Sequence, residues 1–90
     1  ITLQFDPIIT RLAGHDYGKE IFEHQVRNQI DFTDGIIIKF PDQIVKIASS
    51  FVQGFFEEII DRVGFEAIGQ QVKIETGNEM LTKSVFDNLI

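Results

Sequence analysis

The chain has 90 residues, which is enough for a single domain over residues 1–90 and too few for two. Hydrophobic residues make up 43% of it and charged residues 24%, a globular balance that argues against disorder, collagen and coiled coils. Fourteen acidic residues against eight basic ones give a net charge of −6, which argues against a domain built to bind nucleic-acid phosphates or anionic membranes.

The aromatic residues are nearly all phenylalanine: nine Phe, one Tyr and no Trp. Each ring can bury roughly 150–250 Å², so we expect the Phe side chains to fill the core rather than form a binding platform. The absence of cysteine excludes disulfides and thiolate metal sites. No apolar run approaches the roughly 18–20 residues of a membrane span, and Ile1–Asp6 lacks the basic start of a signal peptide. We therefore expect a cytoplasmic setting with no membrane contact.

The first segment of the chain predicts a strand. Residues Ile1–Phe5 alternate between apolar and polar side chains, which is the period of a half-buried strand, and Pro7 ends it. Ile8–Gly14 is either a short second strand or a connecting loop.

A helix is predicted from His15 to about Asn28, where an apolar stripe recurs at helical spacing and Asp16 can cap the first turn. Gly18 costs such a helix about 1 kcal/mol relative to Ala. We therefore expect either that the helix frays there or that a neighbour packs closely against Gly18.

The middle of the chain predicts a buried strand between two breaks. Asp31–Gly35 is a turn cluster, and the apolar run in Gly35–Phe40 does not alternate, so we expect a strand covered on both faces. Pro41 stops it. Gln43–Ala48 is either a buried loop or a short extension of that strand.

The strongest helix signal begins at Ser50, where Ser50 and Gln53 fit a capping box. A wide apolar stripe then runs to Val63, and Gly64 is placed to end the helix. One more turn is expected over Phe65–Gly69.

The last third predicts a strand at Gln71–Glu75 and a final helix to about Leu89, opened by a second capping box at Thr76–Glu79. Strands that alternate with helices favour parallel pairs joined by crossovers. The fold class we predict is α/β, with a small mixed or mostly parallel sheet of about four strands and helices packed against it.

The sequence offers little that would support catalysis. His15 and His24 are nine residues apart, which places them on opposite sides of one helix, so they cannot share a metal ion there. His15 and Asp16 are neighbours that would not face each other on a helix. No glycine-rich phosphate motif and no nucleophile with a base is present. We expect no enzyme, no catalytic residue, no metal and no cofactor.

Two polar features of the central helix are candidates for binding. Glu57, Glu58 and Asp61 form an acidic face, which is either simply solvated or a docking face for a basic partner. Ser49 and Ser50 precede its apolar stripe, where free amides and the positive end of the helix dipole favour a phosphate group. A phosphoserine there would add negative charge beside the acidic face; alternatively Ser50 is only a helix cap.

These segments together resemble a known family. "IIIKF", "IASSFVQGFFEEII" and "GFEAIGQQVKIETGNEMLTKSVFDNLI", a strand, a paired-serine turn and helical stretches, resemble the STAS-like domain family of unknown function. That family is similar to the STAS domains of anti-sigma-factor antagonists, in which a partner kinase phosphorylates a serine at the start of the central helix. The motif there is an Asp, two Ser or Thr residues, a Gly and a Leu. Ser49 and Ser50 match the two hydroxyl residues, whereas Ala48 and Phe51 replace the Asp and the Gly.

The resemblance implies a non-enzymatic regulatory module of a bacterial or phage system. STAS-like domains are expected alongside, or fused to, histidine-kinase-like ATPase domains, so the implied partner is such an ATPase. The expected contact sites are Ser49 and Ser50, as phospho-acceptors or contacts, and a partner-binding face formed by Gln53, Glu57, Glu58 and Asp61. The alternative is a domain that binds a small anion or a nucleotide at the same helix N-terminus.

Overall fold

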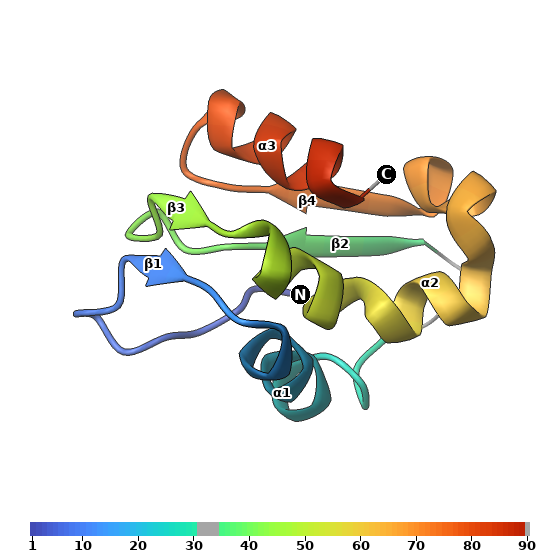
Figure 1. Cartoon of the computed structure of the whole chain (residues 1–90), viewed down its shortest axis with the longest axis horizontal. Coiled ribbons are helices and arrows are strands. Elements are labelled where there is room, and N and C mark those ends of the chain that lie inside the picture. Colours follow the sequence, from blue (N-terminus) through green and yellow to red (C-terminus); the bar gives the residue numbers. More distant parts are fainter. Residues whose placement is uncertain (31–34, 90) are drawn as a thin grey trace.

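The computed structural model describes residues 1–30 and 35–89. These residues form three helices and four short strands (Figure 1). In chain order the elements are β1 (Arg11–Leu12), α1 (His15–Gln25), β2 (Ile36–Lys39), β3 (Lys46–Ile47), α2 (Ser49–Gln71), β4 (Val72–Glu75) and α3 (Glu79–Leu89). The predicted α/β class is confirmed. No helix of the described part is long and apolar enough to cross a bilayer.

The strands form two separate parallel pairs. β2 pairs with β4, with Ile36 opposite Val72, and β1 pairs with β3, with Arg11 opposite Lys46. The expected parallel pairing is therefore found, but in residues 1–30 and 35–89 it is divided between two sheets instead of one sheet of about four strands. The chain turns after β2, where Ile44 N donates to the carbonyl of Pro41 over 3.1 Å, and β3 starts a new pair.

The N-terminal residues run beside β2 without forming a named strand. Thr2 makes one isolated parallel bridge to Lys39, and Leu3 N donates to the carbonyl of Lys39 over 2.9 Å. The pairing stops after Lys39 because the next residue of this chain edge is Pro41, which has no N–H to donate to the carbonyl of Leu3. The side chain of Gln25 bonds both backbone groups of Gln4 at the opposite edge, each over 2.8 Å. The predicted strand Ile1–Phe5 is thus reduced to a bridge, although its alternation is present, since Leu3 is buried and Thr2 is exposed.

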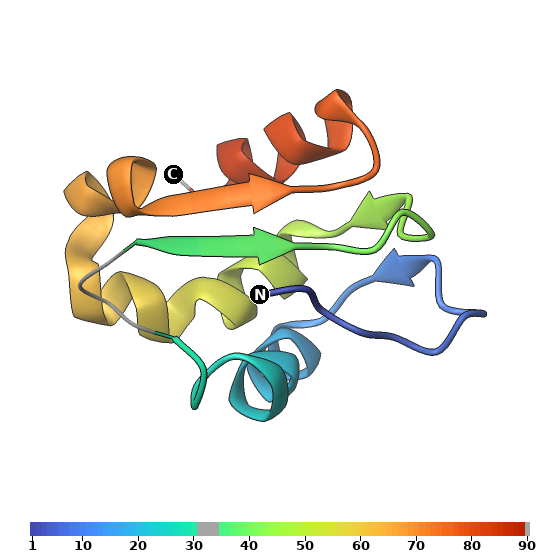
Figure 2. The same ribbon diagram turned by 180° about the vertical axis from the view of Figure 1, so that it is seen from behind.

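The strand β2 is covered on one face only, which corrects the prediction that both its faces are buried. Figures 1 and 2 show that α2 crosses one face of the β2–β4 pair, whereas the strands face the viewer from behind. Ile36 and Ile38 are buried, but Ile37 is 52% exposed. Successive side chains of a strand point to opposite faces, so the apolar run of three isoleucines does not by itself imply two covered faces.

The helices α1 and α2 approach each other closely at two glycines. A methyl group on Gly18 would overlap the carbonyl oxygen of Phe51 and lie 2.8 Å from Phe55 N. A methyl group on Gly54 would overlap the carbonyl oxygen of His15. Of the two alternatives left open for Gly18, the structure therefore has the close neighbour, and the aromatic core lies directly beneath this contact.

Helix α2 is interrupted where the sequence predicted its end. Gly64 has a φ of 80° and a ψ of 160°, outside the helical region, and a second helical piece continues to Gln71. The further turn expected over Phe65–Gly69 is present and longer than predicted. A positive φ is easy for glycine, which explains why the break falls at Gly64.

The capping predictions at the other two helices are wrong. Gly14 occupies the N-cap of α1 with no side-chain cap, and Asp16 lies inside the first turn. At α3 it is Asn78, not Thr76, whose side chain caps the helix: Asn78 Oδ1 accepts from Leu81 N over 2.8 Å. Thr76 instead accepts from Asn78 N over 3.3 Å, which orients the capping residue.

The remaining predictions concern the segments between the main elements and the end of α1. The two segments for which a strand and a loop were both left open each contain a short strand, β1 within Ile8–Gly14 and β3 within Gln43–Ala48. The predicted turn over Asp31–Gly35 lies, except for Gly35, outside the described residues. Helix α1 ends at Gln25, three residues earlier than predicted.

Candidate partner-binding surface

The paired serines lie at the start of α2 and differ in their surroundings. Ser49 is the first helical residue and is exposed. Ser50 is partly buried, and its Oγ accepts a hydrogen bond from Gly14 N over 3.0 Å. The bond joins the loop before α1 to the start of α2.

The capping box predicted for Ser50 and Gln53 is not formed. Ala48 is the N-cap of α2, which has no side-chain cap, and Val52 N donates to the carbonyl of Ala48 over 3.2 Å. Because the helix begins one residue earlier than predicted, the Ser50 hydroxyl is turned toward Gly14 and away from the amides of its own helix.

The helical period arranges most of the predicted contact residues on one stripe of α2. Residues three, four or seven apart lie on the same side of a helix, so the stripe contains Ser49, Ser50, Gln53, Glu57 and Asp61. Gln53 and Asp61 are exposed, and Glu57 is partly buried. Glu58 lies beside this stripe, toward α1. We call Ser49, Ser50, Gln53, Glu57 and Asp61, without Glu58, the α2 stripe.

The acidic residues nearest α1 already have basic partners within the domain. Glu57 Oε2 lies 3.1 Å from Lys19 Nζ, and Glu57 Oε1 lies 3.6 Å from His15 Nε2. Glu58 Oε1 lies 2.8 Å from the guanidinium of Arg27. The hydrogen bond that Lys19 donates to Glu57 raises the pKa of Lys19. The part of the acidic face next to α1 is thus substantially neutralised by the chain itself.

A groove runs between α2 and α3 beside the α2 stripe. Its volume is about 440 Å³, and its lining combines acidic, amide and apolar side chains: Gln53, Glu57, Ile60, Asp61, Phe65, Asn88 and Leu89. Phe65 is 63% exposed, which is unusual in a chain whose other phenylalanines mostly fill the core. The sequence reasoning did not assign Phe65 a place. Its position directly after the helix-breaking Gly64 is the signal that could have placed it at the surface.

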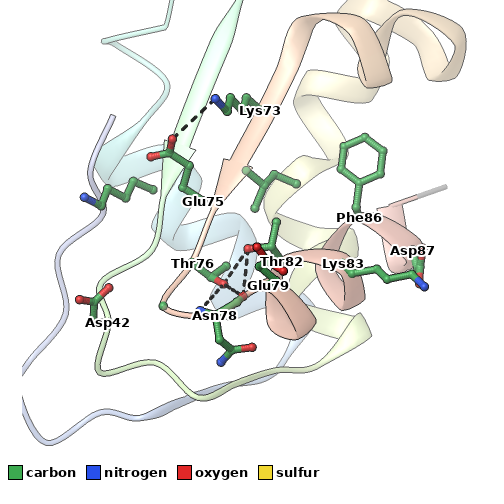
Figure 3. A pocket seen from close by; sticks show the side chains of 13 residues that line it. Asp42, Lys73, Glu75, Thr76, Asn78, Glu79, Thr82, Lys83, Phe86 and Asp87 are labelled. Carbon is green, nitrogen blue, oxygen red and sulfur yellow. Dashed lines mark hydrogen bonds and ion pairs between the residues drawn. The ribbon is translucent and has the colours of Figure 1, made fainter.

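A hollow larger than this groove lies elsewhere, between β4 and α3 (Figure 3). It has a volume of about 890 Å³ and is bordered by Lys73, Glu75, Thr76, Asn78, Lys83 and Phe86 among others. It contains no residue of the α2 stripe. Sequence reasoning missed it because it depends on two distant loops that meet. A methyl group on Gly77 would lie 3.2 Å from Asp42 Cα.

The histidines and acidic residues form no evident metal centre in the described ranges. No group of three or more His, Asp or Glu side chains is placed to hold an ion among residues 1–30 and 35–89. His15 Nδ1 lies 3.6 Å from Asp16 Oδ1, on the exposed surface of α1.

Comparison with known proteins does not assign the chain to a family. No family model matches it, and neither the curated proteins nor the solved structures contain a match. The STAS-like resemblance therefore remains a prediction from the sequence.

Proposed function

We propose that this domain is a non-enzymatic protein-interaction module of a regulatory system, similar to an anti-sigma-factor antagonist, whose partner is a kinase-like ATPase. The contact surface is the α2 stripe together with the groove beside it. The observation that carries the proposal is this groove, in which the polar residues Gln53 and Asp61 adjoin the exposed ring of Phe65.

The groove has the mixed character of a protein-contact surface. The centres of protein interfaces are enriched in aromatic residues and contain few charged residues. Polar residues form the rim around them. Phe65 and Ile60 supply the apolar part, and Gln53 and Asp61 supply the polar rim. A partner with an apolar side chain flanked by a basic residue fits this arrangement.

Of the two serines, Ser49 is the better phospho-acceptor. It is exposed at the beginning of α2, whereas Ser50 Oγ already accepts a hydrogen bond from Gly14 N. A phosphoryl group on Ser49 would be favoured by the helix dipole and would add about −1.5 to −2 charges at one end of the stripe. Where the partner is acidic at that end, phosphorylation of Ser49 would weaken its binding by repulsion between like charges. Phosphorylation would then switch the binding off.

The test is a binding measurement with a kinase-like ATPase encoded beside this gene. Calorimetric titration should show binding to the parent chain and weaker binding to Ser49→Asp, Asp61→Lys and Phe65→Ser. Glu20→Lys on the exposed side of α1 is the matched charge reversal and should bind as the parent does. Unchanged binding in all three stripe and groove variants would contradict the proposed surface.

A second arm of the same experiment separates the anion-binding alternative. Stabilisation of the parent chain by phosphate or nucleotides alone, without binding to the ATPase, would favour that alternative and count against the interaction module.

A further inference from the structure

Strand β4 has a free edge. Among the described residues its only neighbouring strand is β2. Phe40 N donates to the carbonyl of Glu75 over 2.8 Å, so the backbone groups of Glu75 point toward β2. The N–H and C=O of one strand residue point to the same edge, and the next residue points to the opposite edge. Ile74 therefore presents its backbone N–H and C=O at the edge away from β2.

The space next to this edge is hollow. The hollow of about 890 Å³ and a second one of about 560 Å³ both border Lys73, Ile74 and Phe86. Figure 3 shows the ring of Phe86 projecting from α3 on one side of β4, with Lys73 and Glu75 on the strand itself. An additional strand beside Ile74 would occupy this hollow, which lies between β4 and α3.

The side chains of β4 carry an alternating charge pattern. Lys73 and Glu75 share the face of the sheet that no helix covers, and their side chains are 70% and 43% exposed. Lys73 Nζ and Glu75 Oε1 are 3.9 Å apart within the strand, a loose contact. Between them Ile74 is buried on the helix-covered face.

We propose that β4 pairs with β4 of a second copy of this chain, antiparallel and around a two-fold axis at Ile74. The two Ile74 residues then exchange their free N–H and C=O groups in a hydrogen-bonded pair. Each Lys73 comes to lie opposite Glu75 of the second copy, at a non-hydrogen-bonded position, where the Cα atoms approach to about 4.5 Å and side chains interact most closely.

Charge complementarity selects a second copy in this orientation. The two-fold axis forms the Lys73–Glu75 contact twice, since the same patch serves both chains. A parallel, in-register pairing of two β4 strands would instead place Lys73 beside Lys73. The antiparallel pairing also joins two two-stranded sheets into one of four strands, so that each β4 gains hydrogen bonds along its second edge. The proposal is independent of the partner-binding surface on α2.

The test is sedimentation equilibrium of the 90-residue chain from about 10 μM to about 1 mM. The dimer fraction should rise with concentration. Lys73→Glu and Glu75→Lys should each raise the dimer dissociation constant about tenfold, because one reversal turns both symmetry-related attractions into repulsions. The double variant, with both reversals, should recover the affinity of the parent because the two charges are exchanged.

Lys46→Glu, a reversal of an exposed lysine on β3, is the control and should leave the dissociation constant unchanged. Circular dichroism of each variant verifies that it is folded. A chain that stays monomeric throughout would overturn the proposal and leave the edge to a strand of a different protein. A dimer that is insensitive to the single reversals, or is not restored by the double variant, would also overturn it.

Discussion

The two sides of the molecule are built in opposite ways. Where α1 meets α2, the two backbones approach so closely that two glycines have no room for a methyl group, and the aromatic core lies beneath. Where β4 meets α3, the edge of β4 has no partner strand among the described residues, and a hollow of about 890 Å³ lies beside it. The α1–α2 side also has a surface hollow, but it is smaller, about 310 Å³, and it is lined mainly by charged side chains.

The difference indicates how a chain of 90 residues can be both stable and available for binding. A small domain buries a modest fraction of its surface, so its core must be packed efficiently. Here that packing is concentrated between α1, α2 and the sheet, and the acidic residues of α2 that face α1 are used for internal ion pairs. The exposed residues of the α2 stripe, such as Gln53 and Asp61, lie outside the core. Substitutions there, or of the exposed side chains of β4, should therefore cost the fold less stability.

The largest effect is expected in the aromatic core of the packed side. The Phe55 ring is fully buried, and its centroid lies 4.8 Å from that of Phe56 and 5.7 Å from that of Phe22. Phe55→Ala should lower the free energy of unfolding by about 3–5 kcal/mol, because it leaves a cavity. Denaturation with urea measures this, with Phe55→Leu as a milder variant that remains folded.

Phe65→Ala is the control for this comparison of regions, because Phe65 is 63% exposed. It should change the free energy of unfolding by less than about 0.5 kcal/mol. Equal losses at Phe55 and Phe65 would show that the two regions do not differ as described.

A methyl group at the α1–α2 contact should have the next largest effect. Alanine normally stabilises a helix relative to glycine, but at Gly54 the added carbon would lie 2.8 Å from the carbonyl carbon of His15, which cannot move aside. Gly54→Ala should therefore destabilise the fold by about 1–3 kcal/mol. Gly69→Ala, where the nearest atom is 3.9 Å away on Phe86, should stabilise it by up to about 1 kcal/mol. Urea denaturation should show changes of opposite sign in the free energy of unfolding for the two variants. A Gly54→Ala variant that is more stable than the parent would contradict the close contact.

The open side should be less sensitive, and its helix cap provides the test. Asn78 Oδ1 accepts from Leu81 N at the start of α3, so Asn78→Ala should cost about 1 kcal/mol in thermal or urea denaturation. Asn88→Ala, an exposed asparagine in the last turn of α3, should change the stability by less than about 0.5 kcal/mol. No difference between the two variants would mean that Asn78 does not cap the helix.

The smallest effect concerns alkaline pH. Burial raises the pKa of Tyr17 above 10.0, and the hydrogen bond to Glu57 raises the pKa of Lys19 above 10.5. Both groups keep their protons to a higher pH in the folded state than in the unfolded state. The stability that they contribute is present below the unfolded pKa and is lost as the pH rises through the folded pKa.

Tyr17→Phe and Lys19→Met should therefore each lose less stability than the parent between about pH 8 and about pH 11 in urea denaturation. His24→Gln is the control on the same helix and should follow the parent curve. Variants that lose as much as the parent would contradict the coupling of Tyr17 and Lys19 to folding.

The elements with a strong period were predictable from the sequence. The stripes that identified α1, α2 and α3 are carried by residues close together in the chain, and the helices occur where those stripes lie. The sequence left a close neighbour or a frayed helix open at Gly18, and it marked Gly64 as the place where the helical conformation stops, although a further helical piece follows. The excess of phenylalanine was correctly interpreted as core material, because Phe51, Phe55 and Phe56 are all fully buried.

The caps and the strand pairing were less predictable, because each depends on a competing partner. Ser50 was expected to cap its own helix, but Gly14 N, 36 residues away in sequence, takes its hydroxyl. The strands divide into two separate pairs according to which distant segments meet. Neither outcome can be recognised from the local pattern.

The sequence by itself determined the α/β class, the three helices and the polar face of α2, since these follow from composition and from the 3.6-residue period. Only the tertiary structure decided that Lys19 and Arg27 pair with Glu57 and Glu58, that Ile37 is exposed, that Phe65 lines a groove and that β4 has a free edge among the described residues. These features arise from contacts between segments far apart in the chain. A local sequence pattern does not specify which distant segment will pack against it.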